Sequence, residues 1–138
     1  MDSKELYQKL KNYFPNTPDL MRHLHIKACW EYFITENSIE DSAAENAKLH
    51  YFLYKVDEDK LVMTKEKPDI KPDLILYFTE NGILSLIEGN PSADEYYARY
   101  NEVMDNPKPG IDVDNKLNKP RLKLWRIGYK QWRKDFNF

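Results

Sequence analysis

The spacing of apolar residues changes twice along this chain, and this change limits the folds open to it. Between Ile26 and Thr79, four short runs are apolar at alternate positions or throughout, which is typical of β-strands. Before and after this region, apolar residues recur at intervals of three and four, as they do in amphipathic helices. Strands gathered in one part of the chain, with most helices after them, predict an α+β fold.

The strands can be placed by their alternating pattern and by the polar segments between them. Four strands are predicted at residues 26–34, 49–54, 61–64 and 73–79. Polar residues 56–60 form a tight connection, so we expect the second and third strands to pair as a hairpin. A fifth strand is predicted at 121–127, where apolar and basic residues alternate. The sheet is therefore expected to be five-stranded and mostly antiparallel, with helices packed on one face.

Helices are indicated by apolar spacing together with capping residues at their ends. They are predicted at residues 3–14, 83–87, 92–104 and 129–136. Asp2 or Ser3 can cap the first helix, and Thr79 or Asn81 the second. Residues 106–118 lack a clear pattern and are predicted to form a long irregular loop, of a length that is often functional or mobile.

Length and composition indicate one globular domain over residues 1–138. The chain has 138 residues, and 41% of them are apolar and 14% aromatic, which is too many for a disordered chain. Cys29 is the only cysteine, so an intramolecular disulfide is excluded and a reducing compartment is indicated. Residues 1–6 lack the order of a signal peptide, and no apolar run reaches the roughly 20 residues of a membrane span. We therefore expect a cytoplasmic protein.

Charge is distributed unevenly between two neighbouring segments. Residues 80–114 carry two basic and eight acidic residues, whereas residues 115–138 carry eight basic residues and one acidic residue. Such asymmetry can mark contact with nucleic acid or a membrane, or two segments that pair within the fold. Pairing within the fold is the simpler interpretation.

The signatures of the common enzyme and metal sites are missing from the sequence. The four glycines form no phosphate-binding loop, and no G-x-S-x-G motif is present. One cysteine and three histidines give no paired spacing for zinc, so His23, His25 and His50 are interpreted as structural or surface residues. The sequence therefore predicts no catalytic residues, no metal and no cofactor.

One stretch of the chain carries a family resemblance. Residues 72–90 place a strand that begins Pro-Asp before a short helix with Ile83, Leu86 and Gly89 in the pattern L-x-x-L-x-x-G. This stretch resembles the centre of sterol carrier protein type two (SCP-2-like) domains, and residues 121–125 look like the last strand of that family. Two features depart from it, since Pro120 replaces a usual glycine and the connection at 107–118 is longer.

The resemblance implies a non-enzymatic carrier whose internal cavity accepts sterols, fatty acids or acyl thioesters. Residues 128–138 would close that cavity, and their basic side chains could hold an acidic head group or make transient contact with an anionic membrane. An excess of apolar residues on several elements agrees with a cavity, although a solid core would use the same residues. The side chains expected to line the cavity are Leu74, Leu76, Phe78, Leu84, Ile87, Trp125 and Trp132.

Two alternative functions remain open from the sequence. The basic and aromatic C-terminal segment could bind nucleic acid by charge and stacking, but the sequence pI of about 5.9 argues against it. A small enzyme could use acidic residues between 88 and 105 beside the pocket, without a recognisable nucleophile and base. The sequence does not indicate the identity of the ligand or the oligomeric state.

Overall fold

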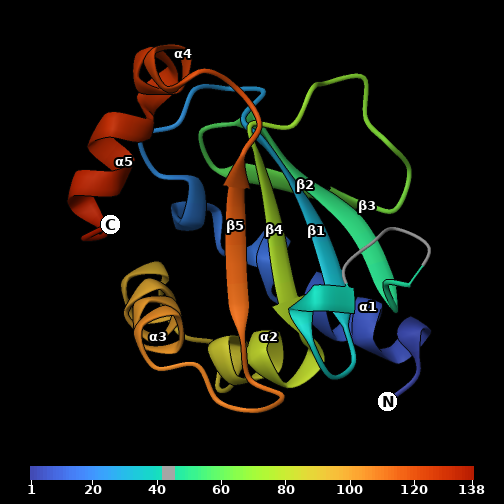
Figure 1. The fold of residues 1–138 in the computed structure, drawn as a ribbon. Coiled ribbons are helices and arrows are strands. Elements are labelled where there is room, and N and C mark those ends of the chain that lie inside the picture. Colours follow the sequence, from blue (N-terminus) through green and yellow to red (C-terminus); the bar gives the residue numbers. More distant parts are fainter. Residues whose placement is uncertain (42–45) are drawn as a thin grey trace.

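The computed structural model describes residues 1–41 and 46–138, which contain a single five-stranded sheet (Figure 1). The strands lie in the order β3-β2-β1-β4-β5. They are β1 Cys29–Thr35, β2 Leu49–Asp57, β3 Lys60–Thr64, β4 Leu74–Thr79 and β5 Val113–Leu117. β1 pairs in parallel with β4, and the other three neighbouring pairs are antiparallel. The predicted hairpin β2–β3 and the mostly antiparallel sheet are confirmed.

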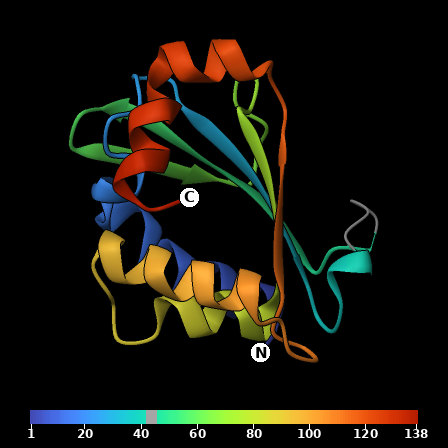
Figure 2. The same cartoon turned by 60° about the vertical axis from the view of Figure 1, so that its left-hand side comes forward.

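The main helices gather on one face of the sheet, as Figure 2 shows, apart from the short helix at 121–124, which lies beyond one end of the strands. They are α1 Ser3–Lys11, α2 Glu80–Ile87, α3 Ala93–Asp105, α4 Arg121–Leu124 and α5 Lys130–Asp135. Shorter helical turns are η1 Phe14–Asn16, η2 Pro18–Met21, η3 Ile39–Asp41 and η4 Trp125–Tyr129. Within the described part of the chain, no helix has the length and apolar character needed to cross a bilayer. The α+β architecture is therefore as predicted.

Local capping interactions explain where the main helices begin. The side chain of Asp2 accepts a 2.8 Å hydrogen bond from the backbone of Glu5 and so caps α1. Thr79 caps α2 in the same way, through a 3.1 Å bond from the backbone N–H of Gly82. Ser92 caps α3. These caps stand at or next to the residues that the sequence pattern indicated.

The position of the fifth strand was predicted wrongly. Residues 121–127, expected to be a strand, form α4 and part of η4, whereas β5 lies at Val113–Leu117 inside the expected loop. β5 is an edge strand that pairs with β4 alone, and only Val113 of its residues is buried, so it carries no apolar alternation. Pro120 precedes α4, a position that suits a helix start, and Leu122 lies in solvent instead of on a sheet face.

The first strand starts later than its apolar pattern suggests. Ile26 shares the alternation of Trp30, Tyr32 and Ile34 but is 50% exposed and lies outside β1. Lys27 has a positive φ of 78°, which interrupts extended backbone just before the strand. The alternation from Trp30 onward is confirmed, since all three of the later residues are buried on the face that the helices cover.

The C-terminal segment crosses the loop after η2 at very close range. Gly128 has φ 109°, and a Cβ built there would lie 2.1 Å from the backbone oxygen of His23. The backbone N–H of His25 donates a 3.0 Å hydrogen bond to the carbonyl of Ile127 at the same crossing. Only glycine fits this crossing, which sets the direction in which α5 runs back over the helix-covered face of the sheet.

Candidate functional site

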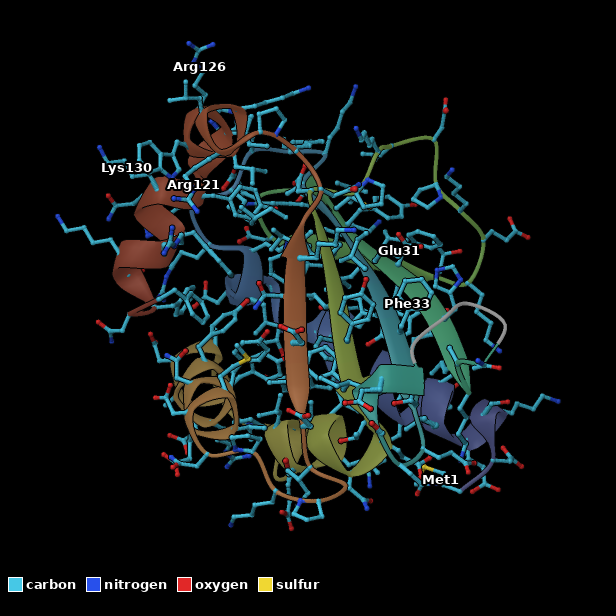
Figure 3. All side chains as sticks on the ribbon, in the orientation of Figure 1. Met1, Glu31, Phe33, Arg121, Arg126 and Lys130 are labelled. Carbon is cyan, nitrogen blue, oxygen red and sulfur yellow. The ribbon has the colours of Figure 1, made fainter. Side chains whose placement is uncertain are left out.

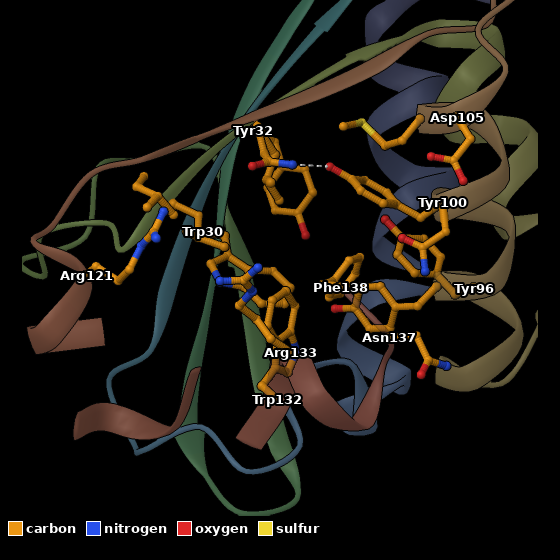
Figure 4. A pocket seen from close by; sticks show the side chains of 17 residues that line it. Trp30, Tyr32, Tyr96, Tyr100, Asp105, Arg121, Trp132, Arg133, Asn137 and Phe138 are labelled. Carbon is orange, nitrogen blue, oxygen red and sulfur yellow. Dashed lines mark hydrogen bonds between the residues drawn. The ribbon is translucent and has the colours of Figure 1, made fainter. Parts of the chain in front are cut away.

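A pocket with a volume of about 680 Å³ lies between the helix-covered face of the sheet, α3 and the C-terminal segment (Figure 4). This volume falls within the range of roughly 300–1,000 Å³ that small-molecule sites occupy. Three strands supply its floor, one face of α3 supplies one wall, and α4 with the residues from α5 onward supplies the other. The pocket is therefore the main candidate site in the described chain.

The floor of the pocket follows directly from the strand register. Trp30 is the cross-strand neighbour of Leu74, and Leu74 in turn pairs with Leu117. The next row, two residues along, contains Tyr32, Leu76 and Asn115. Because side chains two residues apart on a strand share a face, both rows point toward α3 and line the pocket.

Both walls of the pocket carry aromatic side chains. On α3, Tyr97 and Tyr100 follow Tyr96 by one and by four residues, so helical geometry brings the three rings to one side. Trp132 of α5 packs against Tyr97 with ring centroids 5.5 Å apart and stacks on Phe138 at 4.8 Å. Figure 4 shows Tyr32, Tyr100, Trp132 and Phe138 gathered around the same space.

Hydrogen bonds hold several of these walls in place. Asn115 donates a 3.0 Å bond to the hydroxyl of Tyr100, which links β5 to α3. The indole N–H of Trp132 and the hydroxyl of Tyr97 both donate to the carbonyl of Leu20, at 3.0 and 2.8 Å. The pocket shape is therefore fixed by contacts to the N-terminal part of the chain as well as by the sheet.

A buried carboxylate fixes the indole of Trp30. Trp30 donates a 2.9 Å hydrogen bond to the hydroxyl of Tyr129, which donates a 2.7 Å bond to Asp73. The same carboxylate accepts bonds from the backbone of Cys29 and from the ammonium group of Lys119. Asp73 is fully buried, and the three donors that reach its carboxylate, from Tyr129, Cys29 and Lys119, compensate its charge. The network ties the C-terminal segment to the start of β4.

Burial keeps the phenols of the pocket uncharged. It raises the pKa of Tyr32 and of Tyr96 well above the ordinary value of 10.0, and that of Tyr100 to about 12. Burial, with the charge of Asp73 as a second cause, raises the pKa of the Cys29 thiol to about 12. At neutral pH the tyrosines of the floor and of α3 are therefore uncharged, and the Cys29 thiol keeps its proton.

The ionic groups of the pocket lie at its rim. Arg121 and Arg133 line the pocket from the C-terminal segment, and Asp105 lines it from the end of α3. Among the described residues, neither arginine forms an ion pair. The rim therefore offers two guanidinium groups that are free to meet an anionic group on a ligand.

The structure brings only some of the expected cavity residues together. Leu74, Leu76 and Trp132 line the pocket. Phe78 is fully buried in the core, where it packs against Tyr32 with ring centroids 5.8 Å apart.

The other three expected cavity residues lie elsewhere. Leu84 and Ile87 border a second hollow of about 490 Å³ between α1 and α2, which Lys9 also lines. Trp125 is 39% exposed on the outer surface, with the ammonium group of Lys130 at 5.5 Å from its ring centroid.

The α3 tyrosines, the β1 aromatics and the rim arginines were not anticipated as site residues. Tyr96, Tyr97 and Tyr100 stood out as apolar spacing on a predicted helix, but the same spacing describes a core helix. Asn115 and Arg121 were hidden by the wrong placement of the fifth strand. A correct position for β5 would have placed Asn115 beside Leu76.

A second group of aromatic side chains lies on the opposite, open face of the sheet. Phe33 stacks between Tyr77 and His50, with ring centroids 5.7 and 4.4 Å apart. His50 also lies 2.6 Å from the carboxylate of Glu31, and Figure 3 labels Glu31 and Phe33 on this face. Across the described residues, no group of three His, Cys, Asp or Glu side chains could hold a metal.

The comparisons with known proteins give no family for this chain. No protein-family model matches it, and no curated protein sequence matches it significantly. The resemblance of residues 72–90 to SCP-2-like domains stays a prediction, with the strand and short helix that it expects present as β4 and α2. The last strand expected at 121–125 is wrong, because these residues are helical. Fold and site together describe an α+β protein with an aromatic pocket.

Proposed function

We propose that this protein binds an apolar small molecule with one anionic group, such as a fatty acid or an acyl thioester, in the aromatic pocket. The observation that carries the proposal is a hollow of about 680 Å³ with aromatic side chains on its floor and on both walls and with two guanidinium groups at its rim. The apolar part of the ligand would lie between Leu76, Tyr100 and Trp132, and the anionic group would meet Arg121 and Arg133.

The free energy of binding in such a pocket comes mainly from apolar burial. Each buried CH₂ group contributes about 0.8 kcal/mol, so six of them contribute about 5 kcal/mol before the cost of association is subtracted. The walls need no large rearrangement, because Tyr97, Tyr100 and Trp132 are already held by hydrogen bonds. A charge-assisted contact with one or both arginines would fix the orientation of the ligand.

The experiment that tests this proposal measures whether filling the pocket removes ligand binding. Met104 lines the mouth of the pocket and is 39% exposed, so Met104→Trp should fill the space without disturbing the core. Its matched control is Glu102→Trp, which adds the same side chain to an exposed position of α3 outside the pocket. Binding of a fluorescent fatty acid should fall at least about tenfold in the first variant and stay unchanged in the second.

A complementary measurement examines the protein as purified. Native mass spectrometry should show the mass of a bound amphiphile, which organic extraction should remove. Fluorescent fatty acid binding that is equally strong in Met104→Trp would contradict the proposal, as would a protein that is empty and binds no such probe.

The alternative functions receive less support from the geometry. Trp132 and Phe136 are buried, so these aromatic residues of the C-terminal segment are not positioned to stack on nucleotide bases. Of the acidic residues between 88 and 105, Asp105 alone lines the pocket within the described chain. Binding without catalysis is therefore the function that we propose.

A further inference from the structure

The outer surface of α4 and η4 combines exposed apolar residues with basic residues. Leu122 is 65% exposed and Trp125 is 39% exposed. Lys123, Arg126 and Lys130 lie at exposed positions around them. In Figure 3, Arg126 and Lys130 point away from the body of the protein. We call these five residues the α4 surface.

The positive charge of this surface is not compensated by neighbouring carboxylates. Within the described residues, Lys123, Arg126 and Lys130 form no ion pair. The only acidic residue of the C-terminal segment, Asp135, is held by Arg22 at 2.7 Å and by His23 at 2.9 Å. The predicted pairing of the basic segment 115–138 with the acidic segment 80–114 is therefore not found at these three positions in the described chain.

A third exposed apolar residue belongs to the same end of the molecule. The loop before β1 is joined to η4 by the hydrogen bond from His25 to the carbonyl of Ile127. Ile26, next to His25, is 50% exposed, and Lys27 beside it is exposed as well. The loop therefore has the same combination as the α4 surface, in which an exposed apolar side chain lies next to a lysine.

We propose that the α4 surface docks on an anionic lipid bilayer. Leu122 and Trp125 would enter the interfacial region, and Lys123, Arg126 and Lys130 would contact lipid phosphates. Tryptophan is favoured at the boundary between head groups and acyl chains, and basic residues are attracted to anionic lipid. An exposed leucine fits the apolar part of a bilayer, whereas it cannot stack on a nucleotide base. The observations therefore favour a bilayer over a nucleic acid.

The test is flotation of the protein with lipid vesicles. Vesicles of phosphatidylcholine with about 30% phosphatidylserine should bind the protein, and vesicles of phosphatidylcholine alone should not. Raising the salt from about 0.1 M to about 0.5 M should weaken binding at least tenfold, because it screens the charges. Trp30 and Trp132 are buried, so a blue shift of tryptophan emission on binding would report insertion of Trp125.

Charge variants test the basic residues. Lys123→Glu with Arg126→Glu should weaken binding to the anionic vesicles at least about 25-fold, since each basic residue near the surface is worth about a fivefold change. The control is Lys4→Glu with Lys67→Glu, which alters net charge equally at exposed positions outside this surface. It should change binding less than about threefold.

Apolar variants separate a bilayer from a nucleic acid. Leu122→Ser should weaken vesicle binding about tenfold. Leu122→Ile keeps an apolar side chain and should bind the vesicles as tightly as the unchanged protein does. Binding to neutral vesicles as strong as to anionic ones, or no vesicle binding at all, would overturn the proposal. So would tight binding of single-stranded oligonucleotides that Lys123→Glu with Arg126→Glu abolishes and Leu122→Ser leaves unchanged. Met104→Trp, which fills the pocket, should bind vesicles as the unchanged protein does. The vesicle test can therefore fail or succeed independently of the fatty acid test of the pocket.

Discussion

The hydroxyl of Tyr129 donates a 2.7 Å hydrogen bond to the buried carboxylate of Asp73 and accepts one from the indole of Trp30. One phenol thus connects the C-terminal segment, the start of β4 and the floor of the pocket. Burial and the neighbouring Asp73 charge raise the pKa of Tyr129 well above its usual value, so the phenol keeps its proton and remains a donor.

Replacing this hydroxyl should destabilise the fold. Tyr129→Phe would leave the Trp30 N–H without its acceptor and Asp73 with one donor fewer, at a cost of about 1–3 kcal/mol in the free energy of unfolding. Urea unfolding measures the difference. Tyr77→Phe is the matched control, because Tyr77 lies half-buried on the open face of the sheet and forms no hydrogen bond through its hydroxyl among the described residues. Equal losses in both variants would show that the network contributes nothing.

Gly128→Ala should be far more damaging than substitution at another glycine with similar backbone geometry. Both Gly128 and Gly110 have positive φ, at 109° and 75°, but a Cβ at Gly110 meets open space. Gly110→Ala should therefore cost only backbone strain, about 1–2 kcal/mol. Gly128→Ala adds a collision with the His23 carbonyl and should cost more than about 3 kcal/mol or prevent folding. Thermal unfolding of the two variants should differ accordingly, and similar melting temperatures would be the contrary result.

Stability should fall at alkaline pH because many tyrosines are buried. Burial raises the pKa of Tyr13 and Tyr100 to about 12, against 10.0 for an unperturbed phenol. Above about pH 10 the unfolded chain therefore loses protons that the folded chain keeps, so the unfolded state is favoured as pH rises. The contribution of these tyrosines to the free energy of unfolding is fully present below about pH 10 and is lost progressively as the pH rises to about 12. Each such tyrosine contributes up to about 1.4 kcal/mol per pH unit.

Tyrosinate absorbance measures this effect directly. In the folded protein, a large share of the ten tyrosines should ionise only as the chain unfolds, whereas in urea all should ionise together. A single transition at the ordinary phenol pKa in the folded state would mean that the pocket wall and core are open to water.

The rim arginines should select for charge on the ligand. Arg121→Gln with Arg133→Gln should weaken binding of a fluorescent fatty acid about tenfold, because two charge-assisted contacts are removed. Binding of the corresponding methyl ester should change less than about twofold, since it has no charge to lose. Both affinities can be measured by fluorescence titration. A loss of the same size for acid and ester would assign the arginines to pocket shape.

Much of the fold could be predicted because its signals are local. Capping side chains and the polar connection between β2 and β3 act over a few residues, and both were found as expected. β5 could not be predicted, because an edge strand such as Val113–Leu117 is held by backbone bonds to β4 and needs no apolar alternation. The alternation at 121–127 misled, because a run of only seven residues fits a strand and an exposed helix equally well.

The pocket was less predictable than the sheet because a pocket wall and a core have the same composition. Leu76 lines the pocket and Phe78, two residues later on the same face of β4, is fully packed. What separates them is the distance to α3 and the C-terminal segment, which depends on tertiary packing. The need for glycine at position 128 could not be predicted for the same reason, since it arises only where the chain crosses His23 in the folded protein.

The parallel pairing of β1 with β4 divides the sheet into two stretches that are each antiparallel within themselves. Trp30 and Tyr32 belong to one stretch, and Leu74 and Leu76 stand opposite them on the other, so the floor of the pocket spans the seam. Parallel pairing is the slightly weaker kind, which makes this the line along which the two halves would part. A ligand bound across both rows would hold the two stretches together, and slower hydrogen exchange along β1 and β4 would reveal its presence.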